Sequence, residues 1–461
     1  MLRRNTEKEM TDSFGLWALV PTAVVLLLAV TTHRALESLL VGILVGVLII
    51  DPSTILTQLA DKSLAVMTDE DVAWIILVCS LMGSLIALLI RTGATRVFVD
   101  RVAVRVTTRA KALLMSWGLG VALFVDDYLN SLAVGTSMGR ITDKFKTPRE
   151  MLAYVVDSTA APISVIIPIS TWAVFFGVLL EDADVVPKGE GIWLYVEAIP
   201  YMFYAWIAAL MVPLVVSGYV PLIGPMRRAQ MRADETGACI PPGAEHIAKT
   251  YQAIQEKEGA ESSLWLFIGP MAALVGFTWY FDLDFLKGIY VTLAITVMLI
   301  LVRRTLTLED TFNTIIDGVK TMIEPLAVLV CAFLLKEVND DLQLTELVIH
   351  WVSPIVTAET LPLMVFLVMG VVAFATGDNW GVFVISIPIV TALAGNLGAD
   401  MVLVVGATLS GSTFGSHACF YSDATVLTAQ ATGCTPFQHA YTQLPYALIA
   451  AALTALLYWL I

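Results

Sequence analysis

Long apolar segments recur along this chain of 461 residues, and they restrict what it can fold into. A helix needs about 20 consecutive, mostly apolar residues to cross the hydrocarbon core of a bilayer. The candidate spans are residues 14–31, 36–50, 72–90, 192–217, 264–281, 285–302, 321–338 and 439–461. The chain is 58% hydrophobic and only 14% charged, which is far more apolar than a water-soluble domain. We therefore predict an all-α polytopic membrane protein.

Other apolar regions are interrupted. Residues 112–139 and 360–397 each contain two short apolar arms around a polar tip, which predicts two re-entrant hairpins. Residues 150–180 and 400–432 are broken by Ser, Thr, Gly or Pro, which predicts two discontinuous transmembrane helices. Irregular backbone at membrane depth is tolerated only where protein or a water-filled cavity surrounds it. A plain loop between two full spans remains the alternative for each tip.

The basic residues of the connecting segments orient these elements, because cytoplasmic loops carry an excess of Lys and Arg. Such residues flank 112–139 on both sides, so this hairpin enters and leaves on the cytoplasmic side. When the same rule is applied to the later connecting segments, it predicts that the second half repeats the spans, hairpin and broken helix of the first half in the opposite orientation. Inverted-topology repeats of this kind occur in many secondary transporters. The N-terminus is ambiguous, since Arg3, Arg4 and Lys8 favour the cytoplasm whereas the number of crossings favours the outside.

The predicted organisation has two repeats separated by a linker. Its parts are N-terminal transmembrane helices at 1–71, a first repeat at 72–217, a cytoplasmic linker at 218–262, linking transmembrane helices at 263–320 and a second, inverted repeat at 321–461.

Composition and motifs exclude several classes of protein. The formal net charge of −14 argues against nucleic acid as a partner. The five cysteines show no CxxC pair or metal-ligand spacing. No P-loop pattern occurs, so ATP-driven transport has no support. We expect no enzymatic activity and no cofactor, with the lipid bilayer and transported ions as partners; a homodimer is left open.

Carboxylates beside apolar stretches mark the first candidate site. A charged side chain at the centre of a bilayer costs roughly 2.5–3.5 kcal/mol on insertion scales, so one that is present usually serves a cavity, a partner or an ion. Hard oxygen ligands suit Na⁺, and neighbouring carboxylates also suit a proton. We predict that the cation-binding or proton-carrying residues are Asp126, Asp127, Asn130, Asp157, Ser158 and Thr159. A helix-cap role for one member of the Asp126–Asp127 pair is the alternative.

The second half carries a similar set of polar residues at its tip and break. We predict that the substrate or a second cation binds at Thr376, Asp378, Asn379, Ser412, Thr413, Ser416, His417, Ser422, Asp423 and Thr425. A histidine side chain can titrate near neutral pH, which allows a proton role for His417, although a structural role is at least as well supported. Ser and Thr hydroxyls in membrane helices also commonly bond within a helix or across an interface.

Aromatic residues near these breaks are candidates for the wall of a pocket. They are Trp172, Phe175, Trp380, Phe420 and Tyr421. Aromatic faces attract organic cations, but ordinary packing is the more frequent role.

Several of these motifs resemble the signature of the NhaC family of Na⁺/H⁺ antiporters. In the first half they include Phe124-Val-Asp-Asp-Tyr-Leu-Asn130 and Asp157-Ser-Thr-Ala-Ala-Pro162. In the second half they include His417, Ser422-Asp423 and His439 with Thr442-Gln-Leu-Pro-Tyr446. The resemblance covers most of residues 112–180 and 370–450. It implies a cation-coupled carrier in the inner membrane of a bacterium or archaeon, from a family that also contains organic-solute exchangers.

The chain departs from this pattern in its second half. The family usually carries Asp where this chain has Ser416, and Thr-Ser where this chain has Asp378-Asn379. We therefore expect Na⁺/H⁺ antiport by alternating access, with Na⁺-coupled symport or exchange of a small amine, amino acid or carboxylate as the alternative. A channel or an intramembrane aspartyl protease fits less well, because paired repeats with several aspartates and broken helices are not needed for either.

Overall fold

The structure is a computed structural model. It describes residues 14–32, 34–103, 106–124, 127–168, 170–247, 256–257, 262–281, 284–344, 347, 356–377 and 379–461. The regular secondary structure in these ranges is helical throughout, with no strand. The prediction of an all-helical, multi-pass membrane protein is confirmed at this level, whereas the inverted repeat and the re-entrant hairpins stay predictions.

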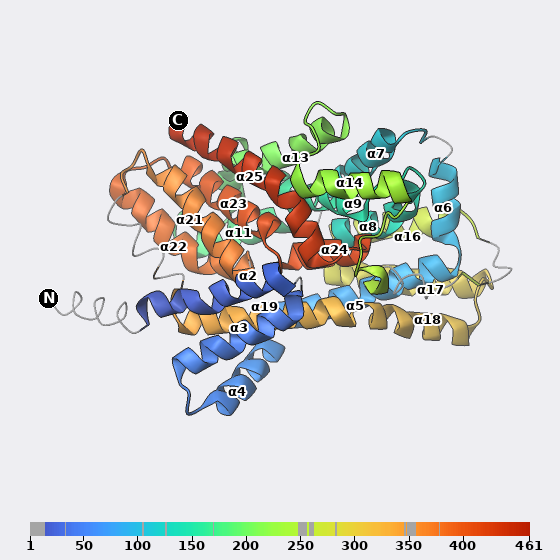
Figure 1. Ribbon diagram of the computed structural model, residues 1–461, viewed down its shortest axis with the longest axis horizontal. Coiled ribbons are helices and arrows are strands. Elements are labelled where there is room, and N and C mark those ends of the chain that lie inside the picture. The colour runs from blue at the N-terminus through green and yellow to red at the C-terminus, as the bar shows by residue number, and fades with distance from the viewer. Residues whose placement is uncertain are drawn as a thin grey trace.

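The helices form two groups, each around its own hydrophobic core (Figure 1). The first group comprises η1 (Gly15–Leu19), α2 (Val20–Thr32), α3 (Ala35–Ile50), α4 (Ile55–Thr68), α5 (Glu70–Arg91), α6 (Ala94–Ala103), α16 (Trp265–Tyr280), α17 (Phe285–Val302), α18 (Leu308–Thr321) and α19 (Ile323–Asp341). In Figure 1, α2, α3, α5 and α19 lie along the lower side of the molecule, and α4 projects below them.

The second group lies above α2, α3, α5 and α19 in the same view, with α6 of the first group beside it, and contains most of the candidate site residues. It comprises α7 (Arg109–Ala122), α8 (Asp127–Asp143), α9 (Arg149–Asp157), α10 (Ala161–Ile166), α11 (Thr171–Asp182), α12 (Gly191–Ala198), η2 (Ile199–Tyr201), α13 (Phe203–Val216), α14 (Gly224–Thr236), α21 (Leu361–Thr376), α22 (Trp380–Leu397), α23 (Met401–Ala418), α24 (Asp423–Thr432) and α25 (Pro436–Leu460). Helices α8 and α24 contact each other, and side chains of both also join the core of the first group.

Three described helices are long and apolar enough to cross a membrane alone: Val72–Arg91, Phe285–Val302 and Pro436–Leu460. Four further spans require two helices joined by a bend: Leu36–Ile50 with Ile55–Thr68, Arg149–Ile166 with Thr171–Glu181, Gly191–Tyr201 with Phe203–Val216, and Leu308–Thr321 with Leu326–Asp341. Bends of 41° to 120° at these joints mean that several apolar segments of the sequence are not straight spans.

Two interruptions have clear local causes. Pro162 lies in the first turn of α10, where its missing N–H costs nothing. In one continuous helix, Pro162 could not donate to the Ser158 carbonyl and its ring would clash with that group, which favours the break between α9 and α10. Between α23 and α24, the Ser422 hydroxyl accepts the Thr425 N–H as an N-cap. Thr425 Oγ1 in turn donates to the Cys419 carbonyl at 2.9 Å. The backbone groups released at this second break are therefore partly satisfied by hydroxyls.

The predicted hairpins correspond to two pairs of helices. Helices α7 and α8 occupy the region of 112–139, and α21 and α22 occupy the region of 360–397. Gly377 ends α21 with a φ of +71°, a conformation that glycine adopts without steric cost. Asp126 and Asp378, one from each tip, lie outside the described residues.

The turn between α2 and α3 lies near the predicted cytoplasmic linker. Arg34 of this turn and His246 of the linker line the same pocket. The α2–α3 turn and the linker therefore lie on the same side of this pocket region, and the side of the membrane on which the N-terminus lies stays open.

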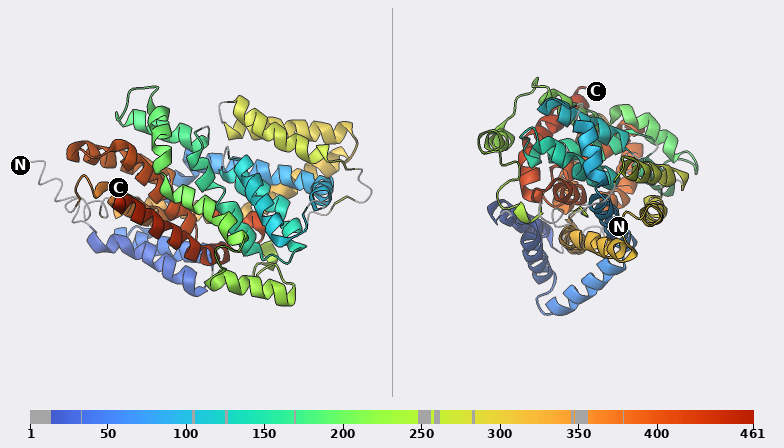
Figure 2. Two further views of the ribbon diagram at one scale, coloured as in Figure 1. Left: turned by 90° about the horizontal axis from the view of Figure 1, so that it is seen from above. Right: turned by 90° about the vertical axis from the view of Figure 1, so that its right-hand side faces the viewer.

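The linker is held tightly against the start of α9. Arg232 of α14 forms a forked ion pair with the buried Glu150, at 2.8 and 2.9 Å. The Arg149 N–H donates to the Cys239 carbonyl at 2.9 Å. Bidentate Arg–carboxylate pairs fix geometry as well as contributing energy. The position of α9 is therefore coupled to that of the linker. In the left view of Figure 2, α14 is the yellow-green helix along the lower edge of the molecule.

Helices α5 and α18 touch through glycine. A Cβ atom on Gly318 would lie 2.5 Å from the Gly83 carbonyl oxygen. Gly318→Ala should therefore push these helices apart and cost about 1–3 kcal/mol, the usual range for overpacking. A thermal melt in detergent should show a lower transition temperature. Gly276→Ala is the control, since no atom lies within 4 Å of its Cβ position; equal melting of both variants would contradict the close contact.

Candidate functional site

Asp157, at the end of α9, lies at the centre of a buried polar cluster. Its Oδ2 atom accepts a 2.6 Å hydrogen bond from Gln443 Nε2. His439 Nε2 lies 3.1 Å and His417 Nε2 3.7 Å from the same oxygen. Asp157, His439 and Gln443 are completely buried. The carboxylate thus joins the broken helix α9 to α23 and α25, which contribute the other three side chains.

A second set of contacts holds His417 in place. Its Nδ1 atom lies 2.7 Å from the Tyr204 hydroxyl of α13, and its Nε2 atom lies 3.1 Å from Ser158 Oγ. Gln443 Nε2 also donates to the His417 carbonyl at 2.5 Å. We call Asp157, Ser158, Tyr204, His417, His439 and Gln443 the Asp157 centre.

The Asp157 centre has capacity for a further ligand. Within the described part of the chain, Asp157 Oδ1, Gln443 Oε1 and the Tyr154 hydroxyl are buried with no hydrogen-bond partner. Buried polar atoms in native proteins are nearly always satisfied, often by water or an ion. Among the described residues, no group of three or more His, Cys, Asp and Glu side chains could hold a metal ion. Linked carboxylate and imidazole groups are suited to holding and passing a proton.

The tip of the first hairpin packs onto this break. Asn130 Nδ2 donates to the carbonyls of Gly120 at 2.8 Å and Thr159 at 2.6 Å. A Cβ atom on Gly120 would lie only 2.1 Å from Thr159 Oγ1, so α7 approaches the break as closely as glycine permits. Asp127 is buried in the first turn of α8. The Asn130 side chain of α8 therefore holds this break from one side.

Asp423 lies at the second break, between α23 and α24. Its Oδ2 atom accepts a 2.5 Å hydrogen bond from the Tyr128 hydroxyl of α8, and its Oδ1 atom accepts the Ala424 N–H at 2.8 Å. The residue is 6% exposed. Asp423 also lines a small cavity of about 10 Å³ with Thr376 and Gly377. This is roughly the room that one water molecule needs.

The tip of the second hairpin contacts the second break. The Tyr421 hydroxyl donates to the Ala375 carbonyl at 2.6 Å, and Gly377 lies against the Tyr421 ring. Asn379 Oδ1 accepts a 2.6 Å hydrogen bond from Ser412 Oγ of α23. Of the predicted residues of this tip, Thr376 therefore lies beside Asp423, whereas Asn379 contacts α23.

Several predicted hydroxyls bond within the backbone near them. Thr159, Thr376 and Thr413 donate to carbonyls one turn earlier in the chain. Ser422 and Thr425 form the cap of α24. These residues follow the ordinary pattern of hydroxyls in membrane helices. Ser416 differs, because its buried hydroxyl has no hydrogen-bond partner among the described residues.

The predicted aromatic residues do not form one wall. Trp172 packs edge-on against Phe383 of α22, with ring centroids 5.9 Å apart, and Phe175 packs at the edge of the same core. Phe420 instead stacks on Phe437 of α25 at 5.4 Å. The side chain of Trp380 lies outside the described part of the structure.

Four residues of these sites were not predicted from the sequence: Tyr128, Tyr204, His439 and Gln443. His439 and Gln443 are four residues apart on one helix face, a spacing that would have indicated a polar stripe in an apolar span. The two tyrosines gave no such signal, because tyrosine occurs widely in membrane helices at interfaces. Only the packing of distant helices identifies them.

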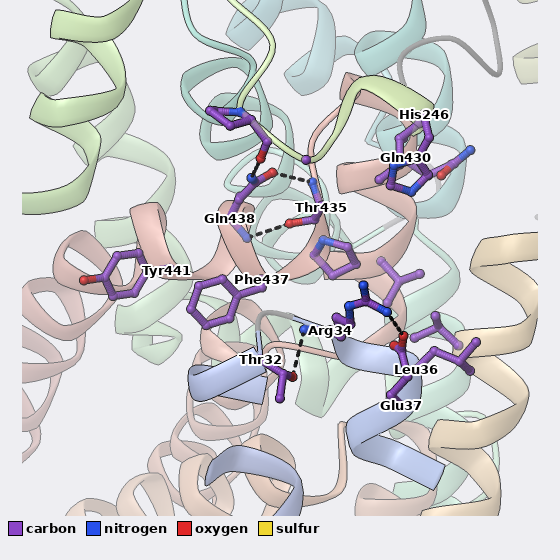
Figure 3. Close-up of a pocket in the computed structure, with 16 residues that line it drawn as sticks. Thr32, Arg34, Leu36, Glu37, His246, Gln430, Thr435, Phe437, Gln438 and Tyr441 are labelled. Atoms are coloured by element: carbon purple, nitrogen blue, oxygen red, sulfur yellow. Dashed lines mark hydrogen bonds and ion pairs between the residues drawn. The ribbon is translucent and has the colours of Figure 1, made fainter. Parts of the chain in front are cut away.

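A wide pocket opens on the linker side of α24 and α25. It has a volume of about 850 Å³ and is lined by the α2–α3 turn, the linker, α19, α24 and the start of α25. We call it the vestibule; its lining residues include Arg34, Glu37, His246, Val328, Val426, Gln430 and Phe437. Figure 3 shows Arg34 paired with Glu37, and Gln438 bonded to Thr435.

Comparisons with known proteins point to one family. Residues 180–461, more than half of the chain, match the Na⁺/H⁺ antiporter family. An uncharacterized protein of Haemophilus influenzae is 29% identical over 481 residues, covering 98% of this chain and 92% of that protein. The malate-2H⁺/Na⁺-lactate antiporter of Bacillus subtilis is 26% identical over 194 residues, covering 42% of this chain and 41% of that protein.

A solved structure is also similar over most of its length. Neisseria gonorrhoeae MtrF, described as illuminating a class of antimetabolite efflux pumps, covers 88% of this chain and 83% of its own. The sequence identity is 14% and the TM-score is 0.37. The family match contains His417, Asp423 and His439, whereas Asp127 and Asp157 precede it.

Substitution of Gln443 tests how much the hydrogen bonds of the Asp157 centre contribute to the stability of the folded protein. Gln443→Leu keeps the size of the side chain but removes both bonds of Nε2, to Asp157 Oδ2 and to the His417 carbonyl. Leaving buried acceptors unpaired should cost about 1–3 kcal/mol, seen as a lower thermal transition in detergent.

A double-mutant cycle supplies the control. If the contact is real, Gln443→Leu should cost clearly less when Asp157 is already replaced by Leu. Additive losses in the double variant would show that the two side chains do not interact.

Proposed function

Because the chain belongs to the Na⁺/H⁺ antiporter family and is a secondary transporter, we propose that it exchanges Na⁺ for H⁺ across the inner membrane of a bacterium or archaeon. The proposed mechanism is alternating access, in which the substrate site opens to one side of the membrane at a time. No bound cofactor enters this proposal, and Na⁺ is a transported ion.

The observation that carries the proposal is the Asp157 centre. A fully buried carboxylate lies against two histidines at the break of α9. A carboxylate in such surroundings is costly unless it is paired or serves a function. Histidine and aspartate together can change protonation during a transport cycle. We therefore assign the proton to Asp157, with His417 and His439 as its partners.

The proposed topology follows from the distribution of Lys and Arg in the connecting segments. The pairs α7–α8 and α21–α22 are proposed as re-entrant hairpins of two inverted repeats, with α9–α11 and α23–α24 as the broken helices. Each pair packs against a break through a side chain, Asn130 in the first case and Tyr421 in the second. Transporters with inverted repeats commonly bind their substrates where broken helices meet.

The surroundings of Asp157 favour a carrier over an aspartyl protease. Its three nearest polar side chains are imidazoles and an amide. An aspartyl protease needs two carboxylates that share one proton. Among the described residues near Asp157, the groups in contact with the carboxylate cannot form such a pair.

The size of the vestibule supports a second candidate function, which is Na⁺-coupled exchange of a small organic solute. Its volume of about 850 Å³ lies within the roughly 300–1,000 Å³ of typical small-molecule sites and far exceeds the needs of a bare ion. The Bacillus subtilis relative, named for malate and lactate exchange, also matches part of the chain.

Asp157→Asn tests the proposed proton role. The change keeps the shape of the side chain but removes its ability to ionise, so Na⁺-driven proton movement should be abolished. Proteoliposomes with an internal pH dye and labelled Na⁺ report both ions. Asp317→Asn is the matched control, because Asp317 is half-exposed on α18 and pairs with Lys320 on the same helix. Proton flux at the wild-type level in Asp157→Asn would reject the assignment.

A thermal-shift screen separates the two candidate functions. Purified protein is melted with amines, amino acids and carboxylates, each with and without Na⁺. A ligand that binds the folded state raises the transition temperature by mass action. For simple antiport, Na⁺ alone should stabilise the protein. A solute that stabilises only in the presence of Na⁺ would instead favour coupled transport of that solute.

A further inference from the structure

The Tyr204 hydroxyl lies beside the ring nitrogen of His417 that does not contact Asp157. Tyr204 is in the first turn of α13 and is completely buried, and its hydroxyl oxygen lies 2.7 Å from His417 Nδ1. The other ring nitrogen, Nε2, lies 3.1 Å from Ser158 Oγ and 3.7 Å from Asp157 Oδ2. One imidazole therefore connects the tyrosine of α13 to the break that follows α9.

The position of the imidazole hydrogen decides what His417 offers to Asp157. A neutral imidazole carries one hydrogen, on Nδ1 or on Nε2, and its other nitrogen is an acceptor. In the first tautomer, Tyr204 donates to Nδ1, and the hydrogen on Nε2 points toward Ser158 and Asp157. In the second tautomer, Nδ1 donates to the Tyr204 oxygen, and Nε2 presents a lone pair to Ser158 and Asp157.

The hydrogen bonds of Tyr204 favour the first tautomer. A buried hydroxyl nearly always has an acceptor for its hydrogen. Among the described residues, His417 Nδ1 is the only acceptor that the Tyr204 hydroxyl contacts. The 2.7 Å to Nδ1 matches an O–H donor, and the 3.1 Å to Ser158 Oγ matches an N–H donor. A phenol is also more acidic than the aliphatic hydroxyl of Ser158, which makes Tyr204 the stronger donor to the one bare nitrogen.

The Asp157 carboxylate favours the same tautomer. Its charge attracts an N–H on Nε2 and repels a lone pair there. Asp157 is completely buried, so water screens this interaction little. In the first tautomer, His417 therefore adds an N–H to the nitrogens of His439 and Gln443 that surround the carboxylate.

His439 lacks a contact of this kind. Its Nδ1 atom is buried with no hydrogen-bond partner among the described residues. Its Nε2 atom lies 3.1 Å from Asp157 Oδ2. The tautomer of His439 thus depends on Asp157 alone, whereas that of His417 is set from both sides of the ring. Tyr204 keeps the hydrogen on His417 Nε2 even when Asp157 takes up a proton and loses its charge.

We propose that Tyr204 is a positioning residue for proton exchange: by donating to His417 Nδ1, it keeps His417 neutral, with its hydrogen on Nε2 and directed at Ser158 and Asp157. His417 then takes up no further proton without losing the bond to Tyr204, so the transported proton is carried by Asp157. This inference rests on the proposed Na⁺/H⁺ exchange and adds to it the residue that selects between two buried proton acceptors.

Nitrogen NMR tests this inference, because a bare imidazole nitrogen and an N–H nitrogen resonate in separate regions of the spectrum. The full-length protein, with ¹⁵N-labelled histidine, is reconstituted in lipid nanodiscs and measured at about pH 8, where an ordinary histidine is neutral. His417→Gln identifies the signals of His417. The wild-type protein should show a bare Nδ1 and a protonated Nε2. Tyr204→Phe should shift the tautomer ratio about fivefold toward Nδ1–H, as expected for the loss of one hydrogen bond.

Two further variants are controls. Tyr195→Phe removes an equally buried hydroxyl, which donates to the Val165 carbonyl at 2.6 Å, and should leave the His417 signals unchanged. Ser158→Ala removes the competing hydroxyl and should leave the hydrogen on Nε2. If Tyr204→Phe does not fold, the wild-type and Ser158→Ala spectra decide, since both report the tautomer with Tyr204 in place.

Transport measurements connect the tautomer to exchange. In proteoliposomes, Tyr204→Phe should lower the maximal rate of Na⁺-driven proton movement about fivefold, in line with the shift in tautomer. Tyr195→Phe should keep the wild-type rate. An unchanged rate in Tyr204→Phe, with a shifted tautomer ratio, would overturn the positioning role.

The outcomes separate this inference from the proposed function. A wild-type His417 with its hydrogen on Nδ1, or with both nitrogens protonated, would overturn the inference and leave Na⁺/H⁺ exchange intact. The same holds if Tyr204→Phe leaves the tautomer ratio unchanged or if Ser158→Ala moves the hydrogen to Nδ1. A parent protein that moves neither Na⁺ nor H⁺ would overturn the proposed function, together with the transport role of Tyr204.

Discussion

The buried contact between Asp157 and the polar side chains of α23 and α25 is the constraint on which the site depends. A carboxylate with no solvent exposure is stable only when donors or cations compensate its charge. Here Gln443 and His439 supply that compensation directly, while His417 lies 3.7 Å away. Helices α9, α23 and α25 must therefore keep their relative positions while the carboxylate is charged. Protonation of Asp157 would relax that requirement, which provides a physical link between a proton and helix position.

The break between α23 and α24 extends this link to the second carboxylate. His417 belongs to the Asp157 centre, and six residues later Asp423 contacts Tyr128 of α8. A displacement of His417 would be transmitted through a short segment held by Ser422, rather than through a long chain of contacts. A change at Asp157 can therefore be felt at Asp423 through this one break.

Much of the architecture was predictable because its causes are local. Apolar length indicates spans, Pro162 favours the break between α9 and α10, and Gly377 permits the turn after α21. The bend after α3 was missed although Asp51-Pro52 stops the helix there, since the apolar pattern alone suggested a plain span. Aspartates could be selected as candidates because a carboxylate in an apolar chain is costly wherever it lies.

The partners of these aspartates were less predictable, because they depend on which distant helices meet. Tyr128 and Asp423 are separated by 295 positions in the sequence, and Tyr204 and His417 by 213. No local pattern encodes such pairs. Likewise, a hydroxyl such as that of Thr413 looks like a ligand in sequence, yet its bond to the Leu409 carbonyl is set by the helix itself.

The most direct test of the proton role of Asp157 is calorimetry of Na⁺ binding in two buffers of different ionisation enthalpy, which counts the protons released per Na⁺ bound. The wild-type protein should release protons on binding Na⁺, whereas Asp157→Asn should release none. Proton release by Asp157→Asn at the wild-type level would contradict the account.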